Sequence, residues 1–108
     1  ATAAAVIYRE LATETQTIVG AKATVKTIES YYKDGKLQQA EDLIIRFAGE
    51  NSPHTYQLGE AFLILGDIYA DKGDNFQARA TLQSIVDGYT PANDGIVEAA
   101  RQRIEKLK

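Results

Sequence analysis

Two acidic residues at matching positions are the first candidates for chemistry in this sequence. Glu29 and Asp67 lie 38 positions apart, and the repeated pattern described below makes them equivalent. Two carboxyl groups can perform acid–base catalysis when their surroundings hold their pKa values apart. We expect both side chains to be solvated in a shallow groove, where nothing would separate the two pKa values. The pair therefore does not predict a catalytic site.

His54 is the only histidine of the chain, and cysteine is absent. Nucleophilic catalysis of the Ser-His-Asp or Cys-His kind needs a positioned imidazole with defined partners. His54 follows Pro53 at an expected helix start, so we interpret it as a surface loop residue. The lack of cysteine excludes disulfides and thiolate chemistry and leaves the redox compartment open.

Residues 71–75, with the sequence Asp-Lys-Gly-Asp-Asn, superficially resemble a calcium-binding loop. Such a loop closes with a glutamate at its twelfth position, and Leu82 stands there instead. The segment is better interpreted as a tight turn between helices. No glycine-rich phosphate loop is expected, because such a loop follows a β-strand and the sequence predicts no strand. The sequence predicts no catalytic residue, metal site or cofactor.

Composition and charge exclude further classes of function. The net charge of −3 and the pI near 5.1 do not provide the clustered basic surface that nucleic-acid binding requires. No apolar run approaches the roughly 20 residues that span a bilayer. A chain of 108 residues with 44% hydrophobic residues predicts one folded soluble domain. It begins with Ala1 and has no methionine, so we expect a processed chain or a piece of a longer protein, with any signal peptide or lipid anchor upstream.

The elements that must position any site follow from an internal repeat. Residues 21–53 and 59–91 align without a gap at a constant offset of 38. Six positions are identical, namely Ala23/Ala61, Tyr31/Tyr69, Gly35/Gly73, Gln39/Gln77, Ala40/Ala78 and Pro53/Pro91. A period of about 20–50 residues marks stacked repeats. Such repeats share a core and expose an extended surface suited to binding.

Each repeat is predicted to be a pair of helices joined by a tight turn, because its apolar residues recur at helical spacing. Gly35 and Gly73 follow the first helix of each pair, where a left-handed residue without a Cβ is favoured. Helix N-caps are expected at Ser52 before Pro53, at Thr90 before Pro91 and, as an alternative for the last helix, at Asn93 or Asp94.

Both ends of the chain carry partial repeats. Residues 1–17 have the apolar spacing of the second helix of a repeat, so they are predicted to form a half repeat. The first loop between repeats is placed around residues 13–17, and it ends near Val19 or Gly20. Residues 95–108 begin a third unit, whose helix combines an apolar face with a polar outer face, as a capping helix does. The apolar face holds Val97, Ala100, Ile104 and Leu107, and the outer face holds Glu98, Arg101, Gln102 and Glu105. We expect a single domain with whole repeats at 20–53 and 58–91.

The chain resembles the tetratricopeptide repeat family over nearly its whole length. The second repeat matches at Leu65, Gly66, Tyr69, Gly73, Ala78, Leu82, Ile85 and Pro91, and the first at Tyr31, Gly35, Ala40, Ile44, Phe47 and Pro53. The first repeat departs from the family at Thr24, the preferred tryptophan position, and at Ile28, the close-contact glycine position. The resemblance implies an all-α, right-handed α-α superhelix of about six antiparallel helices.

A narrower resemblance concerns bacterial envelope proteins. The period of 38 exceeds the usual length of about 34, with the extra residues around 51–56. Residues 65–69 and 76–85 are similar to the final repeats of large Bacteroidota tetratricopeptide proteins. This resemblance alone implies a periplasmic or cell-envelope location and a place at the end of a larger scaffold protein.

In the family, residues of the first helix of each repeat line a concave binding surface. Carried over, these positions are Lys22, Val25, Glu29, Tyr32 and Lys33, then Glu60, Leu63, Asp67 and Asp71. The first set mixes charges and the second is acidic, which suits a peptide with some basic character. The carboxylate clamp of the family needs a lysine and asparagine pattern that Val25 and Glu29 do not supply.

The sequence thus predicts a non-catalytic protein-interaction or scaffold module that binds a protein or peptide, without nucleic acid and without membrane insertion. The alternative is a structural capping or self-association domain with no external ligand. In that case the exposed terminal helices would pair with a second copy.

Overall fold

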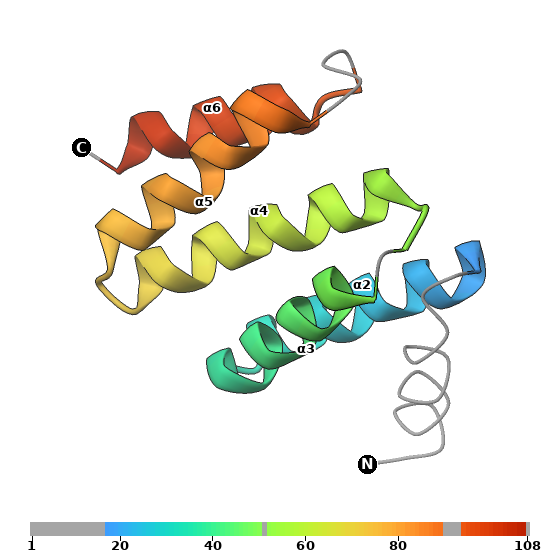
Figure 1. Cartoon of the computed structure of the whole chain (residues 1–108). Helices are drawn as coiled ribbons and strands as arrows, with labels where there is room; N and C mark the ends of the chain where they lie inside the picture. The colour runs from blue at the N-terminus through green and yellow to red at the C-terminus, as the bar shows by residue number, and fades with distance from the viewer. Residues whose placement is uncertain (1–16, 51, 90–93, 108) are drawn as a thin grey trace. The chain divides into compact units, whose positions relative to one another are not determined.

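The structure is a computed structural model, and it describes residues 17–50, 52–89 and 94–107. These residues form five α-helices and no β-strand (Figure 1). The helices are α2 (Ile18–Lys33), α3 (Leu37–Gly49), α4 (Thr55–Asp71), α5 (Asn75–Gly88) and α6 (Ile96–Lys106). The predicted all-helical class is confirmed. The further helix predicted over residues 1–17 falls outside the described residues, except for Thr17.

The chain divides into two compact parts, and the boundary between Ala61 and Phe62 lies inside α4. Unit 1 contains α2, α3 and the beginning of α4, and unit 2 contains the remainder of α4 with α5 and α6. Among the described helices, none is both long enough and apolar enough to cross a lipid bilayer.

In unit 1, α2 and α3 form an antiparallel hairpin (Figure 1). The connecting turn contains Gly35 at φ +76°, a backbone conformation that costs other residues about 1–2 kcal/mol. The Lys36 amide donates to the Tyr31 carbonyl at 2.9 Å and closes the turn on the end of α2. The role predicted for this glycine is confirmed.

The beginning of α2 differs from the sequence prediction. The helix starts at Ile18, earlier than the predicted loop end near Val19 or Gly20. Thr17 has an extended backbone, and its Oγ1 accepts a hydrogen bond from the Gly20 amide at 2.9 Å. A threonine in this conformation is an effective N-cap, which explains why α2 begins at Ile18.

The core of unit 1 joins the facing sides of α2 and α3. Five apolar residues of these helices are fully buried, namely Ala21, Ile28, Ala40, Ile44 and Phe47. Thr24, in the preferred tryptophan position of the resembled family, is also fully buried. Its hydroxyl donates to the Gly20 carbonyl at 2.8 Å, so its burial leaves no polar group unsatisfied.

The beginning of α4 also differs from the sequence prediction. Pro53 was predicted as the first helical residue after a Ser52 cap, but α4 begins at Thr55. Ser52 Oγ accepts from the His54 amide at 3.2 Å, and the Pro53 carbonyl accepts from the Thr55 amide at 3.1 Å. Ser52 therefore stabilises a short turn before the helix. The corresponding cap predicted at Thr90 before Pro91 lies outside the described residues.

In unit 2, α4 and α5 are joined by a turn in which Gly73 has φ +82°. Asp74 is the N-cap of α5, and its Oδ1 accepts from the Gln77 amide at 3.1 Å. This carboxylate is thus used to cap a helix, in agreement with the turn predicted at residues 71–75.

The core of unit 2 is shared by α4, α5 and α6. Its buried members are Leu63, Leu82, Ile85, Ile96 and Ala100, and partly buried side chains that pack against them include Phe62, Val86, Ile104 and Leu107. The polar residues predicted to face outward on α6, Glu98, Arg101, Gln102 and Glu105, are all exposed. At the start of α6, Asp94 Oδ1 accepts from the Ile96 amide at 3.1 Å, while the other cap candidate, Asn93, lies outside the described residues.

Gly66 of α4 lies in close contact with Leu82 of α5. A Cβ placed on Gly66 would lie 2.6 Å from Leu82 Cδ2 and 2.7 Å from Leu82 Cγ, which is much shorter than van der Waals contact. The Leu82 side chain is almost fully buried and has little room to move. The helices therefore need a glycine at this position.

Candidate functional site

Four of the nine residues predicted to bind a partner line one pocket in unit 1. Lys22, Val25 and Glu29 contribute from α2, and Glu60 contributes from the beginning of α4. The pocket has a volume of about 240 Å³, and its other lining residues are Lys26, Tyr56 and Gln57. It is smaller than the roughly 300–1,000 Å³ of typical small-molecule sites, so it suits one side chain of a peptide better than a whole small molecule.

Helical spacing brings the α2 residues to one side of the pocket. Lys22, Val25, Lys26 and Glu29 follow one another at intervals of three, one and three residues, which places them on one face of a helix. On α4, Tyr56 and Glu60 are four residues apart and share a face in the same way. Two short helical faces therefore form the walls.

The pocket combines buried and exposed lining residues. Val25 is 4% exposed and Gln57 is 8% exposed, whereas Tyr56 is 43% exposed. Lys22 and Lys26 are exposed, and Glu29 and Glu60 are half-buried. The Lys26 Nζ lies 3.7 Å from Glu29 Oε1. The two side chains are 70% and 43% exposed, so this pair adds little to stability.

The carboxyl group of Glu60 is electrostatically perturbed. Its partial burial raises its pKa above the ordinary value for glutamate, and the neighbouring Glu29 carboxylate raises the pKa further. Lys26 and Lys22 act in the opposite direction without cancelling this shift. Negative charge on Glu60 is therefore poorly compensated by the residues around it.

The remaining predicted residues lie elsewhere. Tyr32 and Lys33 are at the end of α2, and Asp71 is the exposed last residue of α4. Leu63 is 8% exposed and belongs to the core of unit 2. Its side chain therefore holds the core of that unit together.

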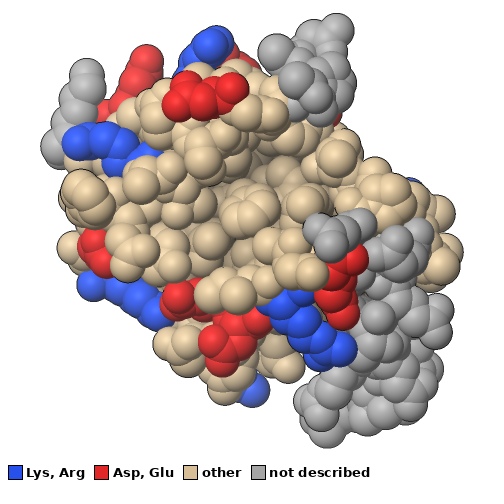
Figure 2. Space-filling model, viewed as in Figure 1, with Lys and Arg blue, Asp and Glu red and all other residues tan. Residues whose placement is uncertain are grey.

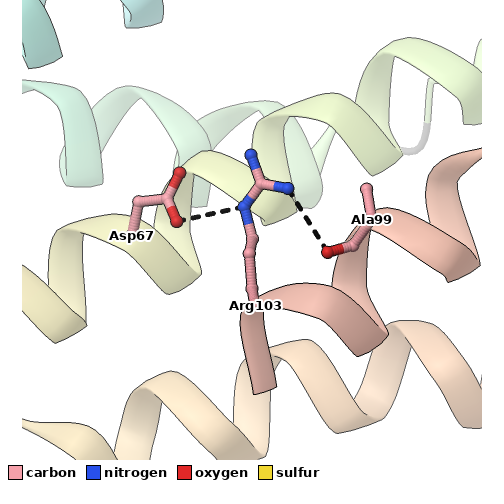
Figure 3. Close-up of polar contacts among 3 residues, drawn as sticks. All are labelled: Asp67, Ala99 and Arg103. Atoms are coloured by element: carbon pink, nitrogen blue, oxygen red, sulfur yellow. Dashed lines mark hydrogen bonds and ion pairs between the residues drawn. The ribbon is translucent and has the colours of Figure 1, made fainter. Parts of the chain in front are cut away.

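Asp67 is engaged by α6. Arg103 Nε donates to Asp67 Oδ1 at 3.0 Å, and Arg103 Nη1 donates to the Ala99 carbonyl at 3.3 Å (Figure 3). The two acidic residues that the sequence analysis compared therefore have different neighbours. Glu29 is beside Lys26 and Glu60 in unit 1, and Asp67 is beside Arg103 in unit 2.

Lys26, Tyr56 and Gln57 line the pocket but were not predicted from the sequence. Lys26 is four residues after Lys22, so helical spacing alone gave a signal for it. Tyr56 and Gln57 precede residue 58, where the second repeat was predicted to begin, so neither was carried over as a binding position. Both lie on α4, four and three residues before Glu60, and helical spacing places them on the face that carries Glu60.

In the described segments, no group of three or more histidine, cysteine, aspartate or glutamate residues could hold a metal ion. His54 is half-buried just before α4 and does not line the pocket. On the described face drawn in Figure 2, acidic and basic side chains are interspersed, and neither sign forms a continuous patch.

The pocket in unit 1 is therefore the part of the predicted surface that the structure assembles into a defined cavity.

Comparison of the chain with models of protein families, with curated proteins and with solved structures finds no match.

Proposed function

We propose that the chain is a non-catalytic protein-interaction module that binds a peptide or an extended protein segment through the pocket of unit 1. The observation that carries this proposal is the convergence of Lys22, Val25, Glu29 and Glu60 on one cavity. A cavity that combines apolar side chains such as Val25 with a few polar and charged groups is the usual arrangement of a binding site.

We further propose that the helices form a tetratricopeptide-like array, a right-handed superhelix of about six helices at the end of a larger bacterial scaffold or envelope protein. Equivalent positions in the two repeats support this architecture. Gly35 and Gly73 have nearly equal positive φ angles of 76° and 82°. Ala40 and Ala78 are both fully buried, and Ile44 and Leu82 are at most 1% exposed.

The test is a selection of binding peptides from a random-peptide display library. Peptides enriched on the native chain are then measured against a pocket variant, Lys22→Ala/Glu29→Gln/Glu60→Gln. The matched control, Glu98→Gln/Arg101→Ala/Glu105→Gln, makes the same net change in charge on the exposed face of α6. Asp67 is left intact because its replacement would disturb the contact with Arg103.

Peptides that bind the native chain and the control but not the pocket variant support the proposal. Enrichment that does not exceed empty beads, or equal binding to all three proteins, contradicts it. Circular dichroism of the three proteins separates loss of binding from loss of fold.

The second candidate is a structural capping or self-association domain, and the two faces of α6 favour its capping form. Ile96, Val97 and Ala100 are at most 3% exposed, while the opposite face is polar and exposed, as in a terminal helix that ends a repeat array. Light scattering over a hundredfold range of concentration tests the self-association form. A mass that rises with concentration supports pairing with a second copy, and a constant monomer mass contradicts it.

A further inference from the structure

We propose that the pocket of unit 1 is a subsite for a single cationic side chain, an arginine or lysine of the bound peptide, whose charged end is held by Glu29 and Glu60. This inference deepens the interaction function proposed above and rests on it. It specifies the chemistry of the partner at one position.

The lining of the cavity matches a cationic side chain in shape and chemistry. Glu29 on α2 and Glu60 on α4 reach the same pocket from different helices. Val25 and Tyr56 supply apolar surface in the same cavity. Arginine and lysine have a long apolar stem and a charged end, so one such side chain matches both parts of the lining.

The balance of charge in the pocket favours a cation. Lys22 and Lys26 also line the pocket, and both are exposed; the Lys26 side chain is 70% exposed, and its Nζ lies 3.7 Å from Glu29 Oε1. An exposed pair of this kind is weak, so an incoming cation can compete with Lys26 for Glu29. Glu60 is half-buried. At Glu60, burial and the repulsion from Glu29 outweigh the attraction of both lysines and raise its pKa. An incoming cation would relieve this repulsion, whereas an incoming carboxylate would increase it.

Tyr56 favours arginine over lysine. This residue is 43% exposed and lines the same pocket as the two carboxyl groups. A guanidinium group is planar, stacks on aromatic rings and donates several hydrogen bonds to carboxylates. A lysine ammonium can use the carboxylates but is less well matched to the ring. We therefore expect arginine to bind more tightly than lysine.

The experiment uses three pentapeptide amides that are identical except for a central arginine, citrulline or glutamate, flanked by leucine and alanine. Citrulline has nearly the shape of arginine but no charge. Binding to the full chain is followed by ¹H–¹⁵N NMR titration at low salt. The same titration is made with Glu60→Gln and with Glu105→Gln, an exposed residue of α6 that serves as the control.

The arginine peptide is expected to bind about tenfold more tightly than the citrulline peptide, the size of effect expected from hydrogen bonds to a charged group. Shifts should concentrate on the lining residues of α2 and α4. The Glu60→Gln variant should lose most of this preference, and Glu105→Gln should keep it. The affinity for the arginine peptide should also fall as salt is added.

Three results would overturn the subsite. Equal binding of the arginine and citrulline peptides at the pocket would remove the cationic specificity while leaving the interaction function intact. Tighter binding of the glutamate peptide would show that the lysines dominate the site. If none of the peptides shifts pocket resonances at millimolar concentration, the subsite is wrong, and the display selection decides separately whether the pocket binds any peptide.

Discussion

Arg103 of α6 donates from its Nε to Asp67 Oδ1 of α4 at 3.0 Å, across 36 residues of sequence. The same guanidinium also donates to the Ala99 carbonyl within α6. Arg103 therefore connects the terminal helix to an earlier helix of unit 2 through a polar contact as well as through the apolar core. Because Asp67 is already engaged, its carboxylate is less available to a partner than the sequence suggested.

Replacing Arg103 by alanine is expected to lower the stability of the chain modestly. The two side chains are 34% and 30% exposed, and partly solvated ion pairs contribute about 0–1 kcal/mol. Urea denaturation measures the change in the free energy of unfolding. Arg101→Ala, an exposed residue of the same helix, is the control and should change stability less. A double-mutant cycle with Asp67→Asn isolates the pair, and a coupling energy of zero would show that the contact does not stabilise the fold.

Gly66→Ala is expected to destabilise unit 2 because the new Cβ would collide with the buried Leu82 side chain. Overpacking of this kind costs about 1–3 kcal/mol, against which alanine offers a gain of up to about 1 kcal/mol in helix propensity. Gly88→Ala in α5 is the matched control, since nothing lies within 4 Å of its Cβ position. Thermal unfolding should show a loss for Gly66→Ala and no loss for Gly88→Ala. If both variants are equally stable, the close approach is not a constraint.

Ala78→Leu tests the packing of α5 in a different way. Ala78 is fully buried, so three additional carbon atoms have no free space and should cost about 1–3 kcal/mol. Ala80→Leu, two residues further along the same helix and exposed, should be nearly neutral. Chemical denaturation of the two variants under identical conditions makes the comparison. Full stability of Ala78→Leu would mean that α5 is placed wrongly in unit 2.

The raised pKa of Glu60 predicts a specific dependence of stability on pH. Folding raises the pKa of this carboxyl group above its value in the unfolded chain, so the folded state binds more protons between the two values. Stability should therefore fall as the pH rises through that window, and the penalty is complete above it. Glu60→Gln removes the penalty. It should be more stable than the native chain at pH 7, with the difference fading below the ordinary glutamate pKa of about 4.3.

A ¹³C NMR titration of the Glu60 carboxyl group checks the cause directly. The titration midpoint should lie above that of glutamate in an unstructured peptide. It should move down in Glu29→Gln, because the second carboxylate no longer opposes ionisation. A midpoint at or below the ordinary value would contradict both the electrostatic description of the pocket and the pH profile predicted from it.

The features that the sequence predicted well are those set by local spacing. Gly35 and Gly73 mark the turns because only glycine adopts a positive φ without strain, and their spacing from neighbouring apolar residues fixes the hairpins. The faces of α6 follow from the same periodicity. Burial of Ala40 and Ala78 follows from their equivalent positions in the repeat.

The features that the sequence did not predict depend on helix ends and on long-range contacts. Tyr56 and Gln57 line the pocket although they precede residue 58, the predicted start of the second repeat. Helix α4 itself begins at Thr55 and not at the predicted Pro53, because Ser52 stabilises a short turn there. Helix boundaries of this kind depend on which amide a side chain bonds, and sequence patterns define them poorly. The contact of Arg103 with Asp67 has no local signature, because it arises only when the core of unit 2 brings α4 and α6 together.

The division of the chain inside α4 has a consequence for how the protein opens. A single helix supplies residues to both units, with Ala61 fully buried in one and Ile68 fully buried in the other. Unfolding of either unit would deprive half of this helix of its packing, yet its backbone hydrogen-bond ladder continues across the boundary. Opening of either unit would therefore leave half of α4 held by its backbone hydrogen bonds alone. The amide protons in the middle of α4 should be among the last to exchange with deuterium.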